Sequence, residues 1–156
     1  MNLVKRISSI MLLGVMMVNL VGCGEKNVEG KLEDLMVSVY EGIPDDQKPM
    51  MLTDIPVTKE NQLGFLGTDK LEVKEALASE SGVGAIAHSV VLVRVEEGSD
   101  VEEVKTLIKE SVDPRKWICV EAETVIVDNV GDLVILIMSN EKNANIIHEN
   151  FLNLSK

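Results

Sequence analysis

The sequence predicts an α+β domain, folded as a two-layer sandwich with a mostly antiparallel sheet of about four strands and helices on one face. Some segments repeat apolar residues at helical spacing, whereas others are β-branched runs typical of buried strands. From residue 71 onward the predicted elements read strand, strand, helix, and then the same order again. Two helices before them give the order α-α-β-β-α-β-β-α.

Residues 1–22 have the pattern of an export signal. Lys5 and Arg6 precede an apolar run over residues 7–21, which is shorter than the ~20 apolar residues of a membrane-spanning helix. The run ends in Leu20-Val21-Gly22-Cys23, which resembles the lipobox of bacterial lipoproteins. We therefore expect a lipoprotein signal peptide over 1–22 and a diacylglyceryl group on the thiol of Cys23. The alternative is an uncleaved membrane helix with a chance cysteine.

The remaining chain is divided into a tether and one domain. Residues 23–29 are expected to form a lipidated tether, and residues 30–156 are enough for a single α+β domain. Two fatty chains would hold the protein firmly in the bilayer. The expected location is the extracytoplasmic face of the bacterial cell membrane.

The charge of the chain argues against nucleic acid as a partner. The sequence has 15 basic and 26 acidic residues, and the leader contains two of the basic ones and none of the acidic ones. The part from Cys23 onward therefore has a formal charge of 13 minus 26, or −13. Such a charge opposes binding to nucleic acid and to anionic lipid.

The first elements follow from apolar spacing and from proline. Residues 30–41 are predicted to form an amphipathic helix, and residues 43–57, with three prolines, an irregular connection. Met50 and Met51 within it are expected to pack against the domain, and the alternative is an exposed methionine patch for a partner. A short helix is predicted over residues 58–66.

The middle of the chain contains the clearest strand and the clearest helix. Residues 71–81 are ambiguous, and partial alternation favours a strand over a helix. The β-branched run within residues 85–95 predicts a central strand. Residues 100–112 are predicted to form a helix, with Ser99 and Glu102 in the spacing of a capping box.

The last part repeats the strand, strand, helix order. Residues 117–122 and 124–127 are expected to be extended, and residues 128–132 form a hairpin turn. An apolar strand follows over residues 133–138. The final helix is expected to be capped by Ser139 or Asn140.

Motifs of metal and cofactor chemistry are missing from the sequence, so we expect neither a metal nor a cofactor. The chain has only two histidines, His88 and His148, too few for a zinc site without other ligands. With Cys23 committed to lipid, Cys119 has no partner for a disulfide. Its apolar neighbours favour a small core residue over a catalytic thiol.

The segment Asp113-Pro114-Arg115-Lys116-Trp117 is the main candidate for binding. Its two basic residues complement the partial negative charge of the preceding helix end, and Trp117 suits a core anchor. The functional alternative is a partner-binding surface made by Arg115, Lys116 and Trp117, with Arg94 and His88 nearby.

Four segments of the chain resemble an uncharacterised family of clostridial lipoproteins, a domain of unknown function. They are Ala76-Leu77-Ala78-Ser79-Glu80, Ile86-Ala87-His88-Ser89, Asp113-Pro114-Arg115-Lys116-Trp117-Ile118-Cys119 and Val125-Ile126-Val127-Asp128-Asn129. The resemblance spans most of residues 30–155. It implies a Gram-positive (Firmicutes) origin and a lipid-anchored domain, and it transfers no catalytic residue. It also implies an accessory role beside membrane-bound O-acyltransferases.

Two classes of function follow. The first is a lipid-anchored binding or accessory module for an envelope protein complex, with no catalysis of its own. The alternative is a small cell-envelope hydrolase or transferase using His88 with Ser89 or Cys119, which requires a cleft that brings His88 to one of these nucleophiles. A solute receptor fits less well, because such receptors generally bind between two lobes.

Overall fold

The computed structural model describes residues 27–155 of the 156-residue chain. The expected signal peptide and the lipidated Cys23 lie outside the described residues. Of the expected tether, residues 27–29 lie within them.

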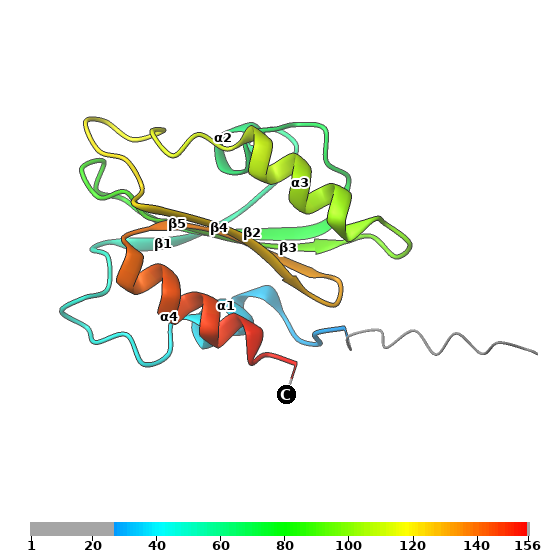
Figure 1. The fold of residues 1–156 in the computed structure, drawn as a ribbon, viewed down its shortest axis with the longest axis horizontal. Coiled ribbons are helices and arrows are strands. Elements are labelled where there is room, and N and C mark those ends of the chain that lie inside the picture. The colour runs from blue at the N-terminus through cyan, green and yellow to red at the C-terminus, as the bar shows by residue number, and fades with distance from the viewer. Residues whose placement is uncertain (1–26, 156) are drawn as a thin grey trace, which may run out of the picture.

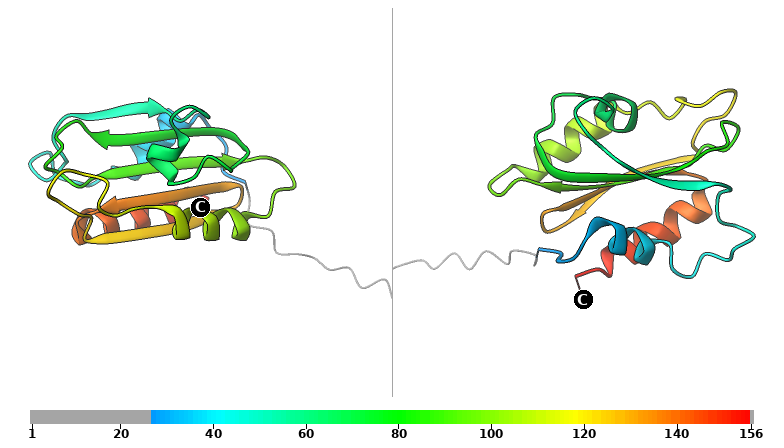
Figure 2. Two further views of the ribbon diagram at one scale, coloured as in Figure 1. Left: turned by 90° about the horizontal axis from the view of Figure 1, so that it is seen from above. Right: turned by 180° about the vertical axis from the view of Figure 1, so that it is seen from behind.

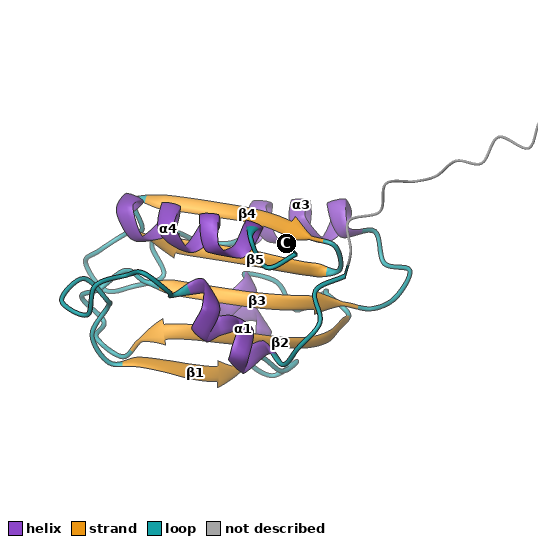
Figure 3. Ribbon diagram, turned by 90° about the horizontal axis from the view of Figure 1, so that it is seen from below, coloured by secondary structure: helices purple, strands orange, loops and turns teal. Residues whose placement is uncertain are grey.

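The centre of the molecule is a five-stranded sheet in the order β1-β2-β3-β5-β4. Every neighbouring pair of strands is antiparallel. The strands are β1 (Leu52–Pro56), β2 (Val73–Ser81), β3 (Ser89–Val95), β4 (Thr124–Val130) and β5 (Leu133–Ser139). Figure 3 shows the sheet from below, with β4 and β1 at its two edges.

Four helices cover the sheet on both faces. They are α1 (Leu32–Val39), α2 (Gln62–Leu66), α3 (Val101–Ser111) and α4 (Glu141–Leu152). Figure 1 shows α1 and α4 below the sheet and α2 and α3 above it. The α+β class is thus confirmed. The predicted four strands in two layers are wrong, because the order is α-β-α-β-β-α-β-β-α and the layers are three.

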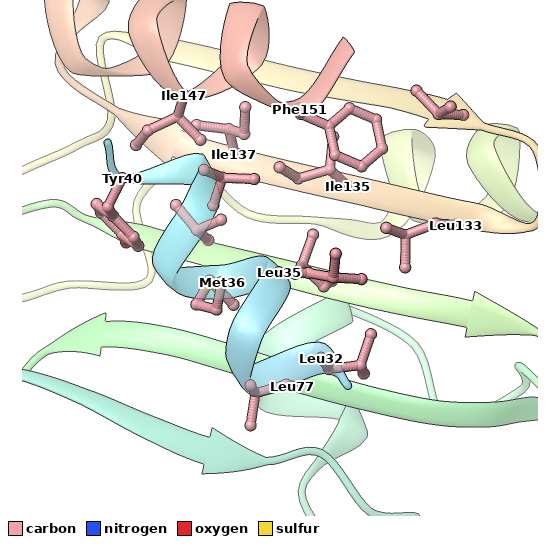
Figure 4. Packing of buried hydrophobic residues seen from close by; sticks show 14 of the residues in the cluster. Leu32, Leu35, Met36, Tyr40, Leu77, Leu133, Ile135, Ile137, Ile147 and Phe151 are labelled. Atoms are coloured by element: carbon pink, nitrogen blue, oxygen red, sulfur yellow. The ribbon is translucent and has the colours of Figure 1, made fainter. Parts of the chain in front are cut away.

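The third layer follows from the two central strands. Every residue of β3 and of β5 is buried, so both faces of these strands need an apolar cover. Alternate side chains enter two separate cores, with Leu92 and Ile135 facing α1 and α4 and Val91 and Leu136 facing α2 and α3. Figure 4 shows the first core, in which Phe151 and Leu35 meet the sheet.

Strand β1 was not predicted. It lies at an edge of the sheet and ends at Pro56, which lacks the N–H that a central strand would need. Proline is tolerated in an edge strand. The prolines of residues 43–57 nevertheless led to the prediction of an irregular connection, in which this strand was not expected. Met50 and Met51, just before β1, are 65% and 69% exposed and do not pack as expected.

Helix and strand ends differ from prediction in detail. Asp100, not Ser99, caps α3, because its carboxylate accepts the N–H groups of Glu102 and Glu103. Asn140 caps α4. The hairpin turn between β4 and β5 narrows to two residues, and Gly131 adopts the positive φ of 56° that such turns require.

The residues 117–122 form a loop and not the expected extended segment. The loop is closed by a 2.9 Å hydrogen bond from the N–H of Ala122 to the carbonyl of Pro114. Cys119 is exposed and has a φ of 63°, so the prediction that it is a core residue is wrong.

The sheet has two ends, which we call the entry end and the far end. At the entry end, residues 27–30 join the domain beside Arg94 and Asp132. At the far end, Ser81, Ser89 and Ser139 lie near one another across β2, β3 and β5. Figure 2 shows from two further sides that the start of the described chain, in blue, and the loop between α3 and β4, in yellow, lie toward opposite ends.

Candidate functional site

Polar side chains meet at the far end on both faces of the sheet. His88 and Ser89 are consecutive, so their side chains point to opposite faces. His88 joins Tyr40 and Ser139, which we call the histidine cluster. Ser89 joins Lys116, which also reaches Glu80, and we call these three residues the lysine cluster.

The histidine cluster links three elements through one buried ring. The Nε2 atom of His88 lies 2.6 Å from the Tyr40 hydroxyl, and its Nδ1 atom lies 2.8 Å from the Ser139 hydroxyl. Tyr40 follows α1, and Ser139 ends β5. A neutral imidazole has one donor and one acceptor nitrogen, so both are satisfied without a charge. Figure 4 places Tyr40 over the start of β3.

Burial keeps this cluster neutral. Desolvation lowers the pKa of His88 to about 4. Burial also raises the pKa of Tyr40, and the Asp54 carboxylate adds to that effect while a hydrogen bond to Ser79 opposes it. Only 1% of His88 is exposed, so the ring is held inside the domain.

The lysine cluster holds the segment after α3 onto the sheet. The ammonium of Lys116 forms a 2.9 Å ion pair with Glu80, and both side chains are mostly buried. It also lies 5.2 Å from the ring centre of Phe65 and 5.1 Å from that of Trp117. Lys116 and Trp117 therefore have structural roles, although Trp117 Nε1 is buried without a hydrogen-bond partner.

The tip of the loop over residues 114–122 is accessible. The side chain of Arg115 is 76% exposed, and it pairs with Glu121 at 2.7 Å. Ile118 is 77% exposed, the highest value among the exposed large apolar side chains of residues 27–155. Of the predicted Arg115, Lys116 and Trp117 set, only Arg115 is presented fully to solvent.

Arg94 lies far from this loop and is buried. Its guanidinium donates to the carbonyls of Val28 and Gly30 and to the Glu75 carboxylate, and Asp132 lies 3.6 Å away. These contacts attach the N-terminal segment to the entry end. Arg94 and His88, predicted beside Arg115, therefore do not form one exposed surface with it.

The geometry does not support the predicted catalytic pairing. His88 contacts Ser139 and Tyr40, which are 0% and 8% exposed, and not Ser89 or Cys119. Ser89 belongs to the opposite face, and Cys119 lies on the exposed loop. A base and a nucleophile must share access to substrate, and these residues do not.

Sequence reasoning missed Tyr40, Ser79 and Ser139. Tyr40 and Ser139 are separated from His88 by 48 and 51 residues, so no local pattern connects them. One signal was available: polar residues interrupt the apolar alternation at the ends of β2, β3 and β5. Polar residues at the ends of neighbouring apolar strands can come together in one polar cluster, as Ser139 and His88 do here beside the end of α1.

No group of three or more His, Cys, Asp or Glu side chains in residues 27–155 is arranged to hold a metal ion. None of the helices described has both the length and the apolar character needed to cross a membrane.

Comparison of the chain with protein-family models, with curated proteins and with solved structures found no match.

Proposed function

We propose that the protein is a lipid-anchored extracytoplasmic module that binds an envelope protein through the loop of residues 114–122. The proposal rests on one observation: the N-terminal segment is attached at one end of the sheet, and the exposed loop lies at the other end. Arg94 fixes Val28 and Gly30 at the entry end, whereas Ile118 and Arg115 are exposed at the far end.

The short tether would orient the domain on the bilayer. Four residues lie between Cys23 and the clamped Val28, so the five Cα–Cα steps allow at most about 18 Å between them. The entry end would then face the membrane, and the far end would lie beyond a sheet roughly 20 Å long. A partner would meet an apolar tip flanked by a charged pair. The family resemblance suggests a membrane-bound O-acyltransferase complex as the partner.

Fluorescence quenching tests the orientation. The protein, lipidated at Cys23 in its host, is reconstituted in vesicles, and the exposed thiol of Cys119 is labelled with a fluorophore. A quencher attached to lipid headgroups should affect this label weakly. It should strongly quench a label at Glu97→Cys in a Cys119→Ser background, because residue 97 lies at the entry end. Equal quenching at the two sites, or an unmodified Cys23, would contradict the proposal.

Cross-linking through Cys119 tests the partner surface. Ile118→Ser and Arg115→Ala should each reduce cross-linking to a specific membrane protein several-fold. Leu152→Ser is the matched control, because Leu152 is also exposed but lies on α4. If all three variants cross-link as the unchanged protein does, the loop is not the binding surface.

A further inference from the structure

A pocket of ≈ 410 Å³ lies beside the histidine cluster, between the end of α1 and the sheet edge formed by β1 and β2. This volume falls within the range of small-molecule sites. Neither the sequence motifs nor the proposed partner loop uses the pocket. Its floor and walls include Tyr40, Ser79, Met36, Leu52, Asp54 and Glu41.

One side of the pocket is apolar. Met36 is almost fully buried and Leu52 partly buried, and both belong to or pack against the core between α1, α4 and the sheet. Val37 at the rim is 67% exposed, although it lines the pocket. A short hydrocarbon chain would cover this surface and would gain free energy by leaving water.

The other side has an excess of negative charge. Among the described residues, neither Asp54 nor Glu41 has a side-chain ion pair. The one cation in the lining, Lys48, already pairs with Asp45 at 3.1 Å. The charge of Asp54 also reaches the floor, where it contributes to the raised pKa of Tyr40 after the larger effect of burial. An anionic ligand would meet repulsion here, and a cationic one would be attracted.

We propose that this pocket binds a small molecule with an ammonium group beside a short apolar chain. The ammonium lies between the carboxylates of Asp54 and Glu41, and the chain lies against Met36 and Leu52. The hydroxyls of Tyr40 and Ser79 form the polar floor. Because Tyr40 bonds the ring of His88, an occupant changes the surroundings of that imidazole.

Histidine NMR provides the test, since the chain has only two histidines. The complete mature protein in detergent micelles is titrated with n-butylammonium, 1-butanol and butyrate. Butylammonium should shift the ring signals of His88, and those of His148 should stay constant because His148 pairs with Asp128 outside the pocket. Butylammonium should bind at least fivefold more tightly than either other compound.

Matched variants separate the carboxylate from general charge effects. Asp54→Asn should weaken butylammonium binding by up to about fivefold, the upper end for the loss of one exposed ion pair, and should leave butanol binding unchanged. Asp46→Asn removes an exposed carboxylate outside the lining and should have no effect. The proposal is overturned if no His88 shift occurs, if butyrate or butanol binds equally well, or if both variants behave alike.

The ammonium group has two sources, a free amine or a lipid headgroup. Nanodiscs containing phosphatidylethanolamine are therefore compared with phosphatidylglycerol nanodiscs. A shift with butylammonium alone assigns the source to a soluble amine, as expected for a pocket at the far end, which the proposed orientation turns away from the bilayer. A His88 shift that depends on phosphatidylethanolamine assigns the source to the lipid and would contradict that orientation. Either result supports the ammonium class.

Discussion

The contacts of His88 could not be predicted from the sequence. It was predicted near the Arg115 surface, or as a base beside Ser89 or Cys119, but its partners Tyr40 and Ser139 lie after α1 and at the end of β5, about 50 residues away in both directions. Contacts of that kind depend on which strands become neighbours. The exposure of Arg115 agrees with the alternative of a partner-binding surface, whereas the burial of Arg94 depends on the packing of residues 28–30.

The burial of His88 makes the stability of the domain depend on pH. The pKa is about 4 in the folded state and near 6.5 when the chain unfolds, so the unfolded state binds more protons between these values. Above pH 6.5 the neutral His88 makes its full contribution to the free energy of unfolding, and this contribution is lost as the pH falls to 4. It amounts to about 3 kcal/mol.

Urea unfolding across pH 4–7 checks this expectation. His88→Gln should be less stable than the unchanged protein at pH 7, and the difference should shrink as the pH falls. The carboxylates titrate in both proteins, so they cancel in the comparison. A difference that stays constant with pH would show that His88 is not held neutral.

Among the elements, those with a strong period were predictable and the edge strand was not. The helices α1, α3 and α4 follow apolar stripes, and β3 and β5 follow long apolar runs. β1 has only five residues, of which one is proline, so its pairing with β2 decides its conformation. The loop over residues 117–122 looked extended because its apolar residues resemble a strand.

The contact between α2 and α3 depends on one glycine. Gly67 ends α2 with a φ of 71°, and a Cβ atom there would lie 2.1 Å from the carbonyl oxygen of Ser111. Both the left-handed conformation and the backbone contact oppose a side chain. Gly67→Ala should therefore reduce the free energy of unfolding by about 3 kcal/mol or more.

Gly84→Ala is the control for this substitution. A Cβ atom at Gly84 meets nothing within 4 Å, so the expected change in stability is within about 0.5 kcal/mol. Equal losses in the two variants, measured by urea unfolding, would contradict the close approach of α2 and α3.

At the scale of the whole molecule, the three layers could have been predicted from the sequence, although two layers were predicted. A strand covered on one face alternates apolar and polar residues, whereas β3 and β5 are apolar almost throughout. Such runs require helices on both faces. The assignment of each helix to a face could not be predicted, because it depends on the order of the strands in the sheet.

Arg94 connects the N-terminal segment to the rest of the domain. Arg94→Met should release the carbonyls of Val28 and Gly30 and leave Glu75 and Asp132 without their cation. We expect a loss of about 2–3 kcal/mol and faster proteolysis between residues 24 and 31. Arg115→Met, which removes an exposed pair, should change stability by less than about 1 kcal/mol. Unchanged proteolysis in Arg94→Met would show that other contacts hold the segment.

The strand order has a consequence for how the chain matures. β5 is the last strand to be synthesised, yet it lies between β3 and β4. Until residue 139 has been added, one edge of β3 has no neighbour and neither core is closed. No fragment that ends before β5 can complete the sheet, so a nascent chain must remain partly unfolded until residue 139 has emerged.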